Sequence, residues 1–238
     1  MTSAAVVKKT AQQFTLQTRE IAGVTVVDTP VVRAAEALAL SHNDLPIYKH
    51  VMRSWLFGVL MIQANETLQR TVDQEVHAVA ALLHDLGWDR ARNSSTVSSD
   101  KRFEVDGAIA ARHFLRSHED GNAWEERRVQ LVWDSIALHS ERSIALYKEI
   151  DVQVVSLGIQ MDFFGPLFGV PENAYNAVAA QYPRDDFRNA FNETMIWLCA
   201  TKPETTFDTW MQPWGEHHVD GYNITGRLGY DTIFDNLP

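Results

Sequence analysis

Apolar residues recur at helical spacing over most of this chain, and few segments alternate with the period of two that is typical of half-buried strands. This pattern predicts an all-α fold. We expect a short strand over residues 21–27 and a polar loop over residues 89–101. The expected helices cover residues 31–41, 45–64, 71 or 73 to 85, 103–117, 124–138, 144–164 and 185–199.

The length of the chain predicts one globular domain. It has 238 residues, of which 45% are hydrophobic, and this is enough for a single substantial core. We expect an N-terminal extension over residues 1–24, the domain itself over residues 25–203, and an irregular tail over residues 204–238. Several glycines and prolines in the tail predict extended loops that pack on the domain.

Charge and cysteine content limit the partners and the compartment. The formal net charge is −10 and no basic stripe is visible, so we expect no nucleic acid partner. Cys199 is the single cysteine, which fits a reducing compartment. No segment approaches the ~18 apolar residues of a membrane span, and the N-terminus lacks the apolar stretch of a secretory signal. We therefore expect a cytoplasmic protein that acts on a small molecule without a membrane partner.

The dipeptide His84-Asp85 is the strongest functional signal. It ends an apolar helical run, and Gly87 follows at the place of a helix-ending glycine. Adjacent side chains inside a helix point about 100° apart, but this constraint loosens at a helix end. The imidazole and the carboxylate of this pair are therefore both expected to reach one metal ion.

Three further residues on other predicted helices support a metal site. His50, His139 and Asp162 each lie on an apolar helix face, and a buried Asp is costly unless it is paired or coordinated. Each residue alone is most simply a core, surface or capping side chain, but the ordered set is harder to explain in that way. We predict one divalent metal per chain, zinc before iron or manganese, with these ligands: His50, His84, Asp85 and Asp162.

His113 does not fit this site. The face built from Glu104, Gly107, Ala108, Ala111 and Leu115 has small residues and is expected to be buried. His113 lies on the opposite side of that helix, so we expect it to be exposed.

The order of these residues resembles the H…HD…D signature of the HD-domain superfamily of metal-dependent hydrolases, and the chain looks closest to its cyanamide hydratase-like branch. The resemblance covers roughly residues 25–235 and implies an HD-domain helical bundle with the metal site in its core. Its matching stretches are residues 28–31, 50–58, 81–87, 102–108, 136–140, 158–162, 182–184 and 202–207.

The resemblance also bears on the number of metals. Members with two metals typically carry a further His four residues before the glycine that aligns with Gly107, and this chain has Phe103 there. The resemblance therefore implies a single metal, which disfavours the di-iron oxygenase branch.

A bound divalent metal lowers the pKa of its water from 15.7 toward about 7 and so supplies hydroxide at neutral pH. We expect His139 or Glu104 to carry protons, Arg53 or Lys101 to stabilise developing negative charge, and Asp89 to orient the water. Each has a simpler alternative as a structural charge. Aromatic side chains are expected to line a narrow pocket: Trp55, Phe57, Trp88, Trp133 and Phe164.

Two reaction classes stay open. Hydration of a small uncharged cyanamide, nitrile or isonitrile is favoured, because a phosphate site needs several cations near the metal and only Arg53 is obvious. Hydrolysis of a phosphomonoester or nucleotide is the alternative, and an inactive ligand-binding HD scaffold is the third hypothesis. The resemblance also implies a homo-oligomer, and we hypothesise that tail aromatics serve its interface: Trp210, Trp214, Tyr222 and Tyr230.

Overall fold

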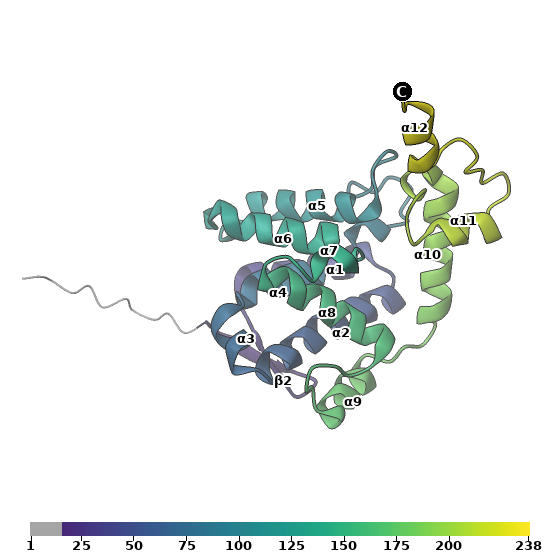
Figure 1. Cartoon of the computed structure of the whole chain (residues 1–238). Helices are drawn as coiled ribbons and strands as arrows, with labels where there is room; N and C mark the ends of the chain where they lie inside the picture. The colour runs from purple at the N-terminus through teal and green to yellow at the C-terminus, as the bar shows by residue number, and fades with distance from the viewer. Residues whose placement is uncertain (1–15) are drawn as a thin grey trace, which may run out of the picture.

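The computed structural model describes residues 16–238 and confirms the all-α prediction: this part of the chain forms twelve α-helices and one two-stranded sheet (Figure 1). The first six helices are α1 (Pro30–His42), α2 (Leu45–Gln63), α3 (Glu66–Thr71), α4 (Gln74–Leu83), α5 (Phe103–Ser117) and α6 (Glu126–Leu138). The others are α7 (Arg142–Ala145), α8 (Ile150–Phe164), α9 (Glu172–Gln181), α10 (Phe187–Thr201), α11 (Gln212–His218) and α12 (Gly229–Asp235).

The expected strand over residues 21–27 is instead part of a hairpin. Strand β1 (Thr18–Ile21) pairs antiparallel with β2 (Val24–Val27). The two turn residues, Ala22 and Gly23, both have positive φ, as the tightest hairpin turns require. The single-strand prediction was wrong because it passed through this turn.

Helix α2 lies at the centre of the fold and positions much of the site. Asp44 caps its N-terminus by accepting a hydrogen bond from the backbone N–H of Ile47. Two glycines let α2 and α8 approach closely, because a Cβ atom on Gly158 would lie only 2.8 Å from the carbonyl oxygen of Ser54 and 3.0 Å from Cα of Gly58. This close packing brings His50 of α2 beside Asp162 of α8.

Two parts of the predicted helix pattern need correction. The expected helix over residues 144–164 is two helices, α7 and α8, because the chain turns between them and Glu149 adopts an extended backbone before α8. The tail is also less irregular than expected, since it contains α11 and α12. The short helices α3 and α9 were not predicted.

The C-terminal helices α11 and α12 lie near α10 (Figure 1). Side chains of α10 and of the segment after it belong to a second apolar cluster. Trp210 and Trp214 pack against Phe191 there, with ring centroids 6.2 and 6.0 Å from its ring. Tyr230 on α12 is instead 68% exposed. The hypothesised interface aromatics therefore divide into side chains that hold the tail on the domain and one that faces solvent.

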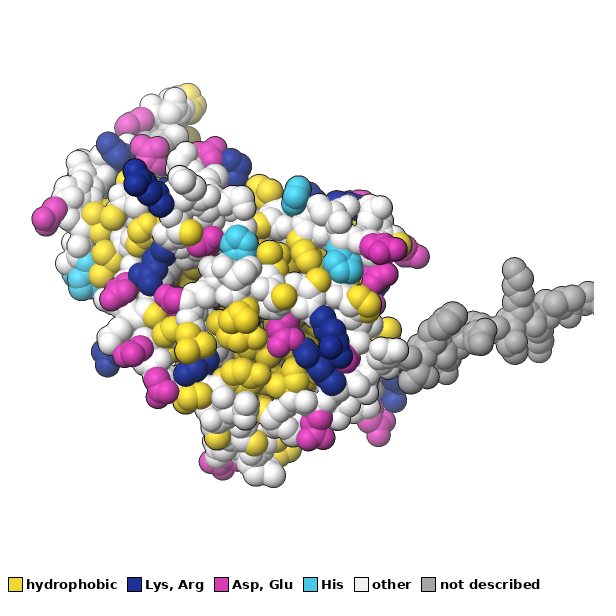
Figure 2. Space-filling model, turned by 180° about the vertical axis from the view of Figure 1, so that it is seen from behind, with side chains coloured by type: hydrophobic (Ala, Val, Ile, Leu, Met, Phe, Trp, Pro, Cys, Tyr) yellow, Lys and Arg dark blue, Asp and Glu magenta, His cyan; other side chains and the backbone are white. Residues whose placement is uncertain are grey.

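The surface seen from behind shows acidic and basic side chains interspersed around an apolar area (Figure 2). On this face the Lys and Arg side chains form no continuous stripe. Among residues 16–238, no helix has both the length and the apolar character needed to cross a bilayer.

Candidate metal centre

The backbone at the end of α4 presents His84 and Asp85 together. Asp73 caps the start of this helix by accepting hydrogen bonds from two backbone N–H groups. His84 still has helical backbone angles, but Asp85 leaves them (φ −104°, ψ 18°) and a 3-10 turn, Leu86–Trp88, follows. The helix therefore ends where the sequence predicted.

Gly87 has a different role from the one expected. Its φ is not among the positive values of this chain, so it is not a left-handed helix cap. A Cβ atom at this position would instead clash with the backbone of Phe103 at the start of α5. The glycine is required because two backbones approach closely.

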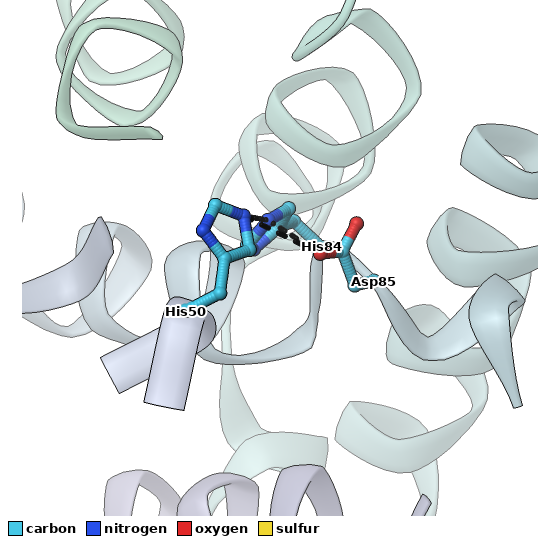
Figure 3. Close-up of side chains that lie close together, drawn as sticks. All are labelled: His50, His84 and Asp85. Carbon is cyan, nitrogen blue, oxygen red and sulfur yellow. Dashed lines mark hydrogen bonds and ion pairs between the residues drawn. The ribbon is translucent and has the colours of Figure 1, made fainter. Parts of the chain in front are cut away.

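Three of the four predicted ligands converge at this point: His50, His84 and Asp85, here called the metal-ligand cluster (Figure 3). Nε2 of His84 lies 3.0 Å from Oδ2 of Asp85, and Nε2 of His50 lies 3.6 Å from the same oxygen. The two Nε2 atoms are 3.4 Å apart. All three residues are essentially inaccessible to solvent.

His139 faces the same point from the end of α6. Its Nε2 lies 3.9 Å from Oδ1 of Asp85, and its ring centroid lies 5.0 Å from that of His84. The imidazole is buried. His139 therefore lies beside the metal-ligand cluster, although the group whose ligand atoms all lie within 4.8 Å of one another consists of the other three residues.

The Nδ1 atom of each of the three imidazoles already makes a hydrogen bond within the protein. Its partners are Asp162 at 2.6 Å for His50, the Ala81 carbonyl at 2.8 Å for His84, and the Ile136 carbonyl at 2.7 Å for His139. Because these partners are acceptors, each Nδ1 carries the proton and each Nε2 presents a lone pair. Three lone pairs therefore point toward the carboxylate of Asp85.

This arrangement fits a cation. Neither oxygen of Asp85 accepts a hydrogen bond from the described residues, although both are buried. Unpartnered buried carboxylate oxygens and facing lone pairs are costly unless positive charge lies between them. Imidazole nitrogens and a carboxylate oxygen are ligands that suit zinc, and iron and manganese also accept these ligand types.

The electrostatics of the cluster agree with this fit. Burial lowers the pKa of His50, and it lowers the pKa of His139 to about 4, so both rings stay neutral near pH 7. Burial acts to lower the pKa of His84 as well, but the neighbouring Asp85 outweighs it and raises that pKa. The Asp85 carboxylate thus favours positive charge at this point.

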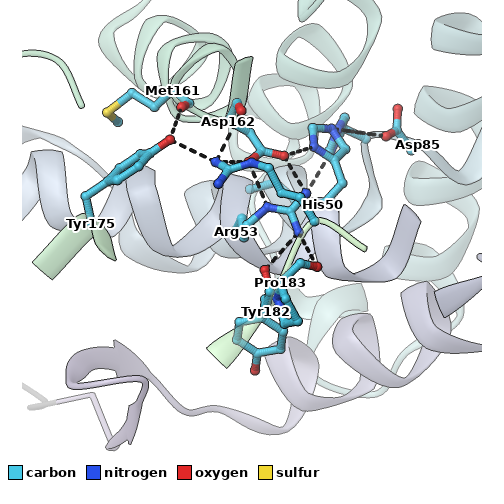
Figure 4. A network of polar contacts seen from close by, with 11 residues as sticks. His50, Arg53, Asp85, Met161, Asp162, Tyr175, Tyr182 and Pro183 are labelled. Atoms are coloured by element: carbon cyan, nitrogen blue, oxygen red, sulfur yellow. Dashed lines mark hydrogen bonds and ion pairs between the residues drawn. The ribbon is translucent and has the colours of Figure 1, made fainter. Parts of the chain in front are cut away.

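The structure places Asp162 behind His50 rather than beside Asp85 (Figure 4). Oδ2 accepts hydrogen bonds from Nδ1 of His50 at 2.6 Å and from Nη2 of Arg53 at 2.7 Å. Oδ1 accepts from Nε of Arg53 at 2.7 Å and lies 2.6 Å from Nη2 of Arg184. Both oxygens are therefore fully engaged away from the point where the Nε2 atoms meet.

Most of the hydrogen-bond donors of Arg53 are likewise engaged within the protein. It is fully buried, makes a two-pronged contact with Asp162, and donates from Nη1 to the Tyr182 carbonyl at 3.0 Å. With a further contact from Nη1 to the Pro183 carbonyl at 3.4 Å, these hydrogen bonds use four of the five N–H donors of the guanidinium. The structure shows Arg53 supporting Asp162, which is the structural alternative to a role in stabilising an anion.

Glu104 lies behind His139. Its carboxylate is buried and is held by Arg102, whose Nη2 donates to Oε1 at 2.6 Å, and by the hydroxyl of Ser140. Burial acts to raise the pKa of Glu104, but Arg102 outweighs it and the net direction is downward. The structure thus brings Glu104 near the predicted proton carrier His139 but keeps it ionised and engaged.

Lys101 and Asp89 lie elsewhere. Lys101 lines a separate cavity and pairs with Asp100 at 2.6 Å. Asp89 contacts His42 at 2.8 Å and accepts from the backbone N–H of Ala91 at 2.9 Å. Neither side chain lines the cavity that contains the metal-ligand cluster.

That cavity, here called the aromatic pocket, has a volume of about 370 Å³. Of the aromatics predicted to line it, Trp88 and Phe164 do, whereas Trp55 and Phe57 are core residues and Trp133 packs at the edge of the core. The sequence analysis missed most of its wall: Ser140, Arg142, Ile159, Gln160, Phe163, Phe191 and Trp210. Phe163 and Gln160 lie within two residues of the predicted ligand Asp162. Their position in the sequence could therefore have indicated that they lie near the site.

His113 is exposed, as predicted, and the opposite face of α5 is buried. The small residues of that face pack against the site, since Gly107 lies close to the backbone of His84. The helix-face argument that set His113 aside from the metal centre is confirmed.

In a comparison with known families, residues 47–160 match the HD domain. The matched segment contains the metal-ligand cluster and His139, and it ends two residues before Asp162. A search among curated proteins finds no significant match to the chain.

Proposed function

Since the metal-ligand cluster belongs to an HD domain, we propose that this protein is a metal-dependent hydrolase or hydratase that adds water to a small uncharged substrate. The cyanamide, nitrile and isonitrile class is the favoured substrate. In this reaction one water adds across a carbon–nitrogen triple bond, and its two hydrogens and one oxygen all remain in the amide product. No oxidant, reductant or second cofactor is needed.

The observation that carries the proposal is the common orientation of the site. Three buried imidazoles have Nδ1 engaged and Nε2 directed toward the unpartnered carboxylate of Asp85. A divalent ion held there would supply a water with a pKa near 7 and polarise the substrate. The protein's own part is to fix the donors in advance, which saves the cost of arranging them during the reaction.

We propose His139 as the fourth ligand, together with His50, His84 and Asp85. Its Nε2 faces Oδ1 of Asp85, and its Nδ1–H is held by the Ile136 carbonyl in the same way as that of His84 by Ala81. Asp162 then acts as a positioning residue that orients His50 through the ring nitrogen facing away from the site.

The cations of the site favour an uncharged substrate over a phosphate ester. Arg53 is engaged by Asp162 and by backbone carbonyls, and Lys101 lines another cavity. Within the aromatic pocket, Arg142 is the one Lys or Arg side chain among the lining residues. Phosphoryl transfer relies on several cations around the transferring group, so this wall is better suited to a neutral substrate.

Much of the remaining pocket wall is apolar. Trp88, Phe163 and Phe191 line its wall, and the ring of Trp88 stacks near that of His50 with centroids 6.4 Å apart. An apolar wall beside the ligands strengthens their electrostatic interactions and keeps bulk water away.

Metal analysis of purified protein tests the proposal first. We expect about one zinc, iron or manganese per chain in the wild type, its loss in Asp85→Asn, and its retention in Asp120→Asn, an exposed carboxylate near the end of α5. The wild type is then assayed with nitriles and cyanamides and with a phosphomonoester. Absence of metal under all loading conditions, or hydrolysis of the phosphomonoester alone, would contradict the proposal.

A further inference from the structure

The aromatic pocket is larger than the smallest substrates of the proposed class require. Its 370 Å³ is near the lower end of the roughly 300–1,000 Å³ of pockets for drug-sized ligands. At about 30 Å³ per water molecule, it has room for about a dozen non-hydrogen atoms. A substrate of three or four such atoms would leave most of this largely apolar cavity unfilled.

The walls of the pocket are largely aromatic. Phe191 lies at the centre of its aromatic side chains, with ring centroids 5.6 Å from Trp88, 5.7 Å from Phe163 and 6.2 Å from Trp210. Phe163 and Phe164 are 46% and 68% exposed, which leaves aromatic surface uncovered at the end of α8. Aromatic faces and edges favour a planar apolar partner.

One polar side chain of the wall lacks a partner. Gln160 is only 8% exposed, and its Nε2 donates to the hydroxyl of Ser156 at 3.1 Å. Its Oε1 accepts no hydrogen bond from the described residues. A buried amide oxygen without a partner is costly, so a ligand with an N–H group would gain by donating to it.

We propose that the substrate is an uncharged molecule of about a dozen non-hydrogen atoms with an aryl or similarly flat apolar group. That group packs against Phe163 and Phe191, while the reacting carbon faces the metal-ligand cluster and Gln160 accepts a hydrogen bond from the nitrogen of the amide product. This inference rests on the proposed function, since it specifies the substrate of the same site.

Calorimetric titration of the metal-loaded protein with three probes tests the inference. Benzamide represents the amide product of an aryl substrate, acetamide has the same amide without the ring, and inorganic phosphate represents the phosphohydrolase alternative. We expect benzamide to bind at least tenfold more tightly than acetamide or phosphate. Equal affinity for the two amides, or preference for phosphate, overturns the inference.

A matched pair of variants assigns the binding to the pocket. Phe163→Ala removes an aromatic wall and is expected to weaken benzamide binding about threefold to tenfold. Phe234→Ala removes a similarly exposed phenylalanine from α12, which does not line the pocket, and should leave binding unchanged. An equal effect of both variants would show that benzamide binds elsewhere and would overturn the assignment.

Gln160→Leu is the second local test. It keeps the volume of the side chain and removes the acceptor, so benzamide should lose affinity while toluene, which has no N–H group, should not. Unchanged benzamide binding contradicts the role of Gln160. Metal content of the same preparations tests the proposed function separately: a protein without metal that still prefers benzamide overturns the hydratase proposal and leaves the pocket assignment standing.

Discussion

Asp162 binds the imidazole of His50 from the side opposite to Asp85. The Asp162 carboxylate accepts the Nδ1–H at 2.6 Å, while Nε2 of the same ring lies 3.6 Å from the Asp85 carboxylate. One histidine thus connects the metal-ligand cluster to the buried pair of Asp162 and Arg53. The consequence is that a residue outside the cluster controls the orientation of a ligand within it.

Asp162→Asn is therefore expected to weaken metal binding about 10- to 100-fold without abolishing it, because second-layer partners of ligating histidines typically have effects of this size. Competition with a chromogenic chelator measures the change, and circular dichroism checks that the variant folds. A complete loss of metal, equal to that in Asp85→Asn, would instead identify Asp162 as a ligand.

His139→Ala separates the two roles considered for His139. As a ligand, this side chain should contribute to metal affinity, so the variant should hold metal at least tenfold more weakly than the wild type. If His139 serves only as a proton carrier, the metal content stays unchanged and hydration activity alone falls. The two readouts, chelator competition and turnover, are made on the same preparation.

Lys202 anchors the segment after α10 to α5. Its Nζ lies 2.6 Å from Oδ2 of Asp106 and donates to the Lys101 carbonyl at 2.9 Å, and both members of the pair are at least 95% buried. Lys202→Met leaves the Asp106 carboxylate buried without its cation, and the expected loss in free energy of unfolding is about 3–5 kcal/mol.

Urea unfolding measures this loss, and Lys148→Met is the matched control. Lys148 pairs with Asp134 in a partly exposed position, where such pairs contribute less than about 1 kcal/mol. The double variant Lys202→Met/Asp106→Leu should recover much of the stability, because it removes the uncompensated charge. A loss below 1 kcal/mol in Lys202→Met would contradict the role of this pair.

His77 predicts a pH dependence of stability. It is buried in α4, neither ring nitrogen has a hydrogen-bond partner among the described residues, and burial lowers its pKa from 6.5 to about 4. Below pH 6.5 the unfolded chain takes up a proton that the folded protein does not accept until about pH 4. The stability of the folded state therefore falls as the pH decreases through this range.

The full loss is about 3 kcal/mol, at about 1.4 kcal/mol per pH unit. His77→Leu removes this contribution, so the stability difference between wild type and variant should change by that amount between pH 7 and pH 4. Urea unfolding at several pH values measures it. A difference that does not vary with pH would show that His77 is not titrating as its burial requires.

The local parts of this fold were predictable from the sequence. Residues 103–117 form α5 as expected, because small and apolar residues mark one face clearly. The break between α7 and α8 could not be predicted, because the segment from Leu146 to Glu149 contains neither glycine nor proline. Short helices such as α3 bury none of their residues, and so they lack the apolar periodicity that would reveal them.

In the candidate site, too, some features could be predicted from the sequence and others could not. The pair at the end of α4 was found because the two residues are adjacent and the helix visibly ends there. The contact of Arg53 with Asp162 joins residues 109 positions apart, so the sequence offered a structural ion pair for Arg53 only as one alternative among its possible roles. Phe191 lies on a predicted helix and Trp210 in the predicted tail, but neither prediction indicated that these side chains line the pocket.

The hydrogen bonds of the ring nitrogens also determine how easily the site could be transferred to another protein scaffold. His84 and His139 are each oriented by a carbonyl three residues earlier in their own helix, so either helix end would carry its ligand's orientation into another scaffold. His50 depends on a carboxylate 112 residues away. A designer who transplants this centre can copy two of its imidazoles as short peptide segments, but must build the acceptor for the third from a separate helix.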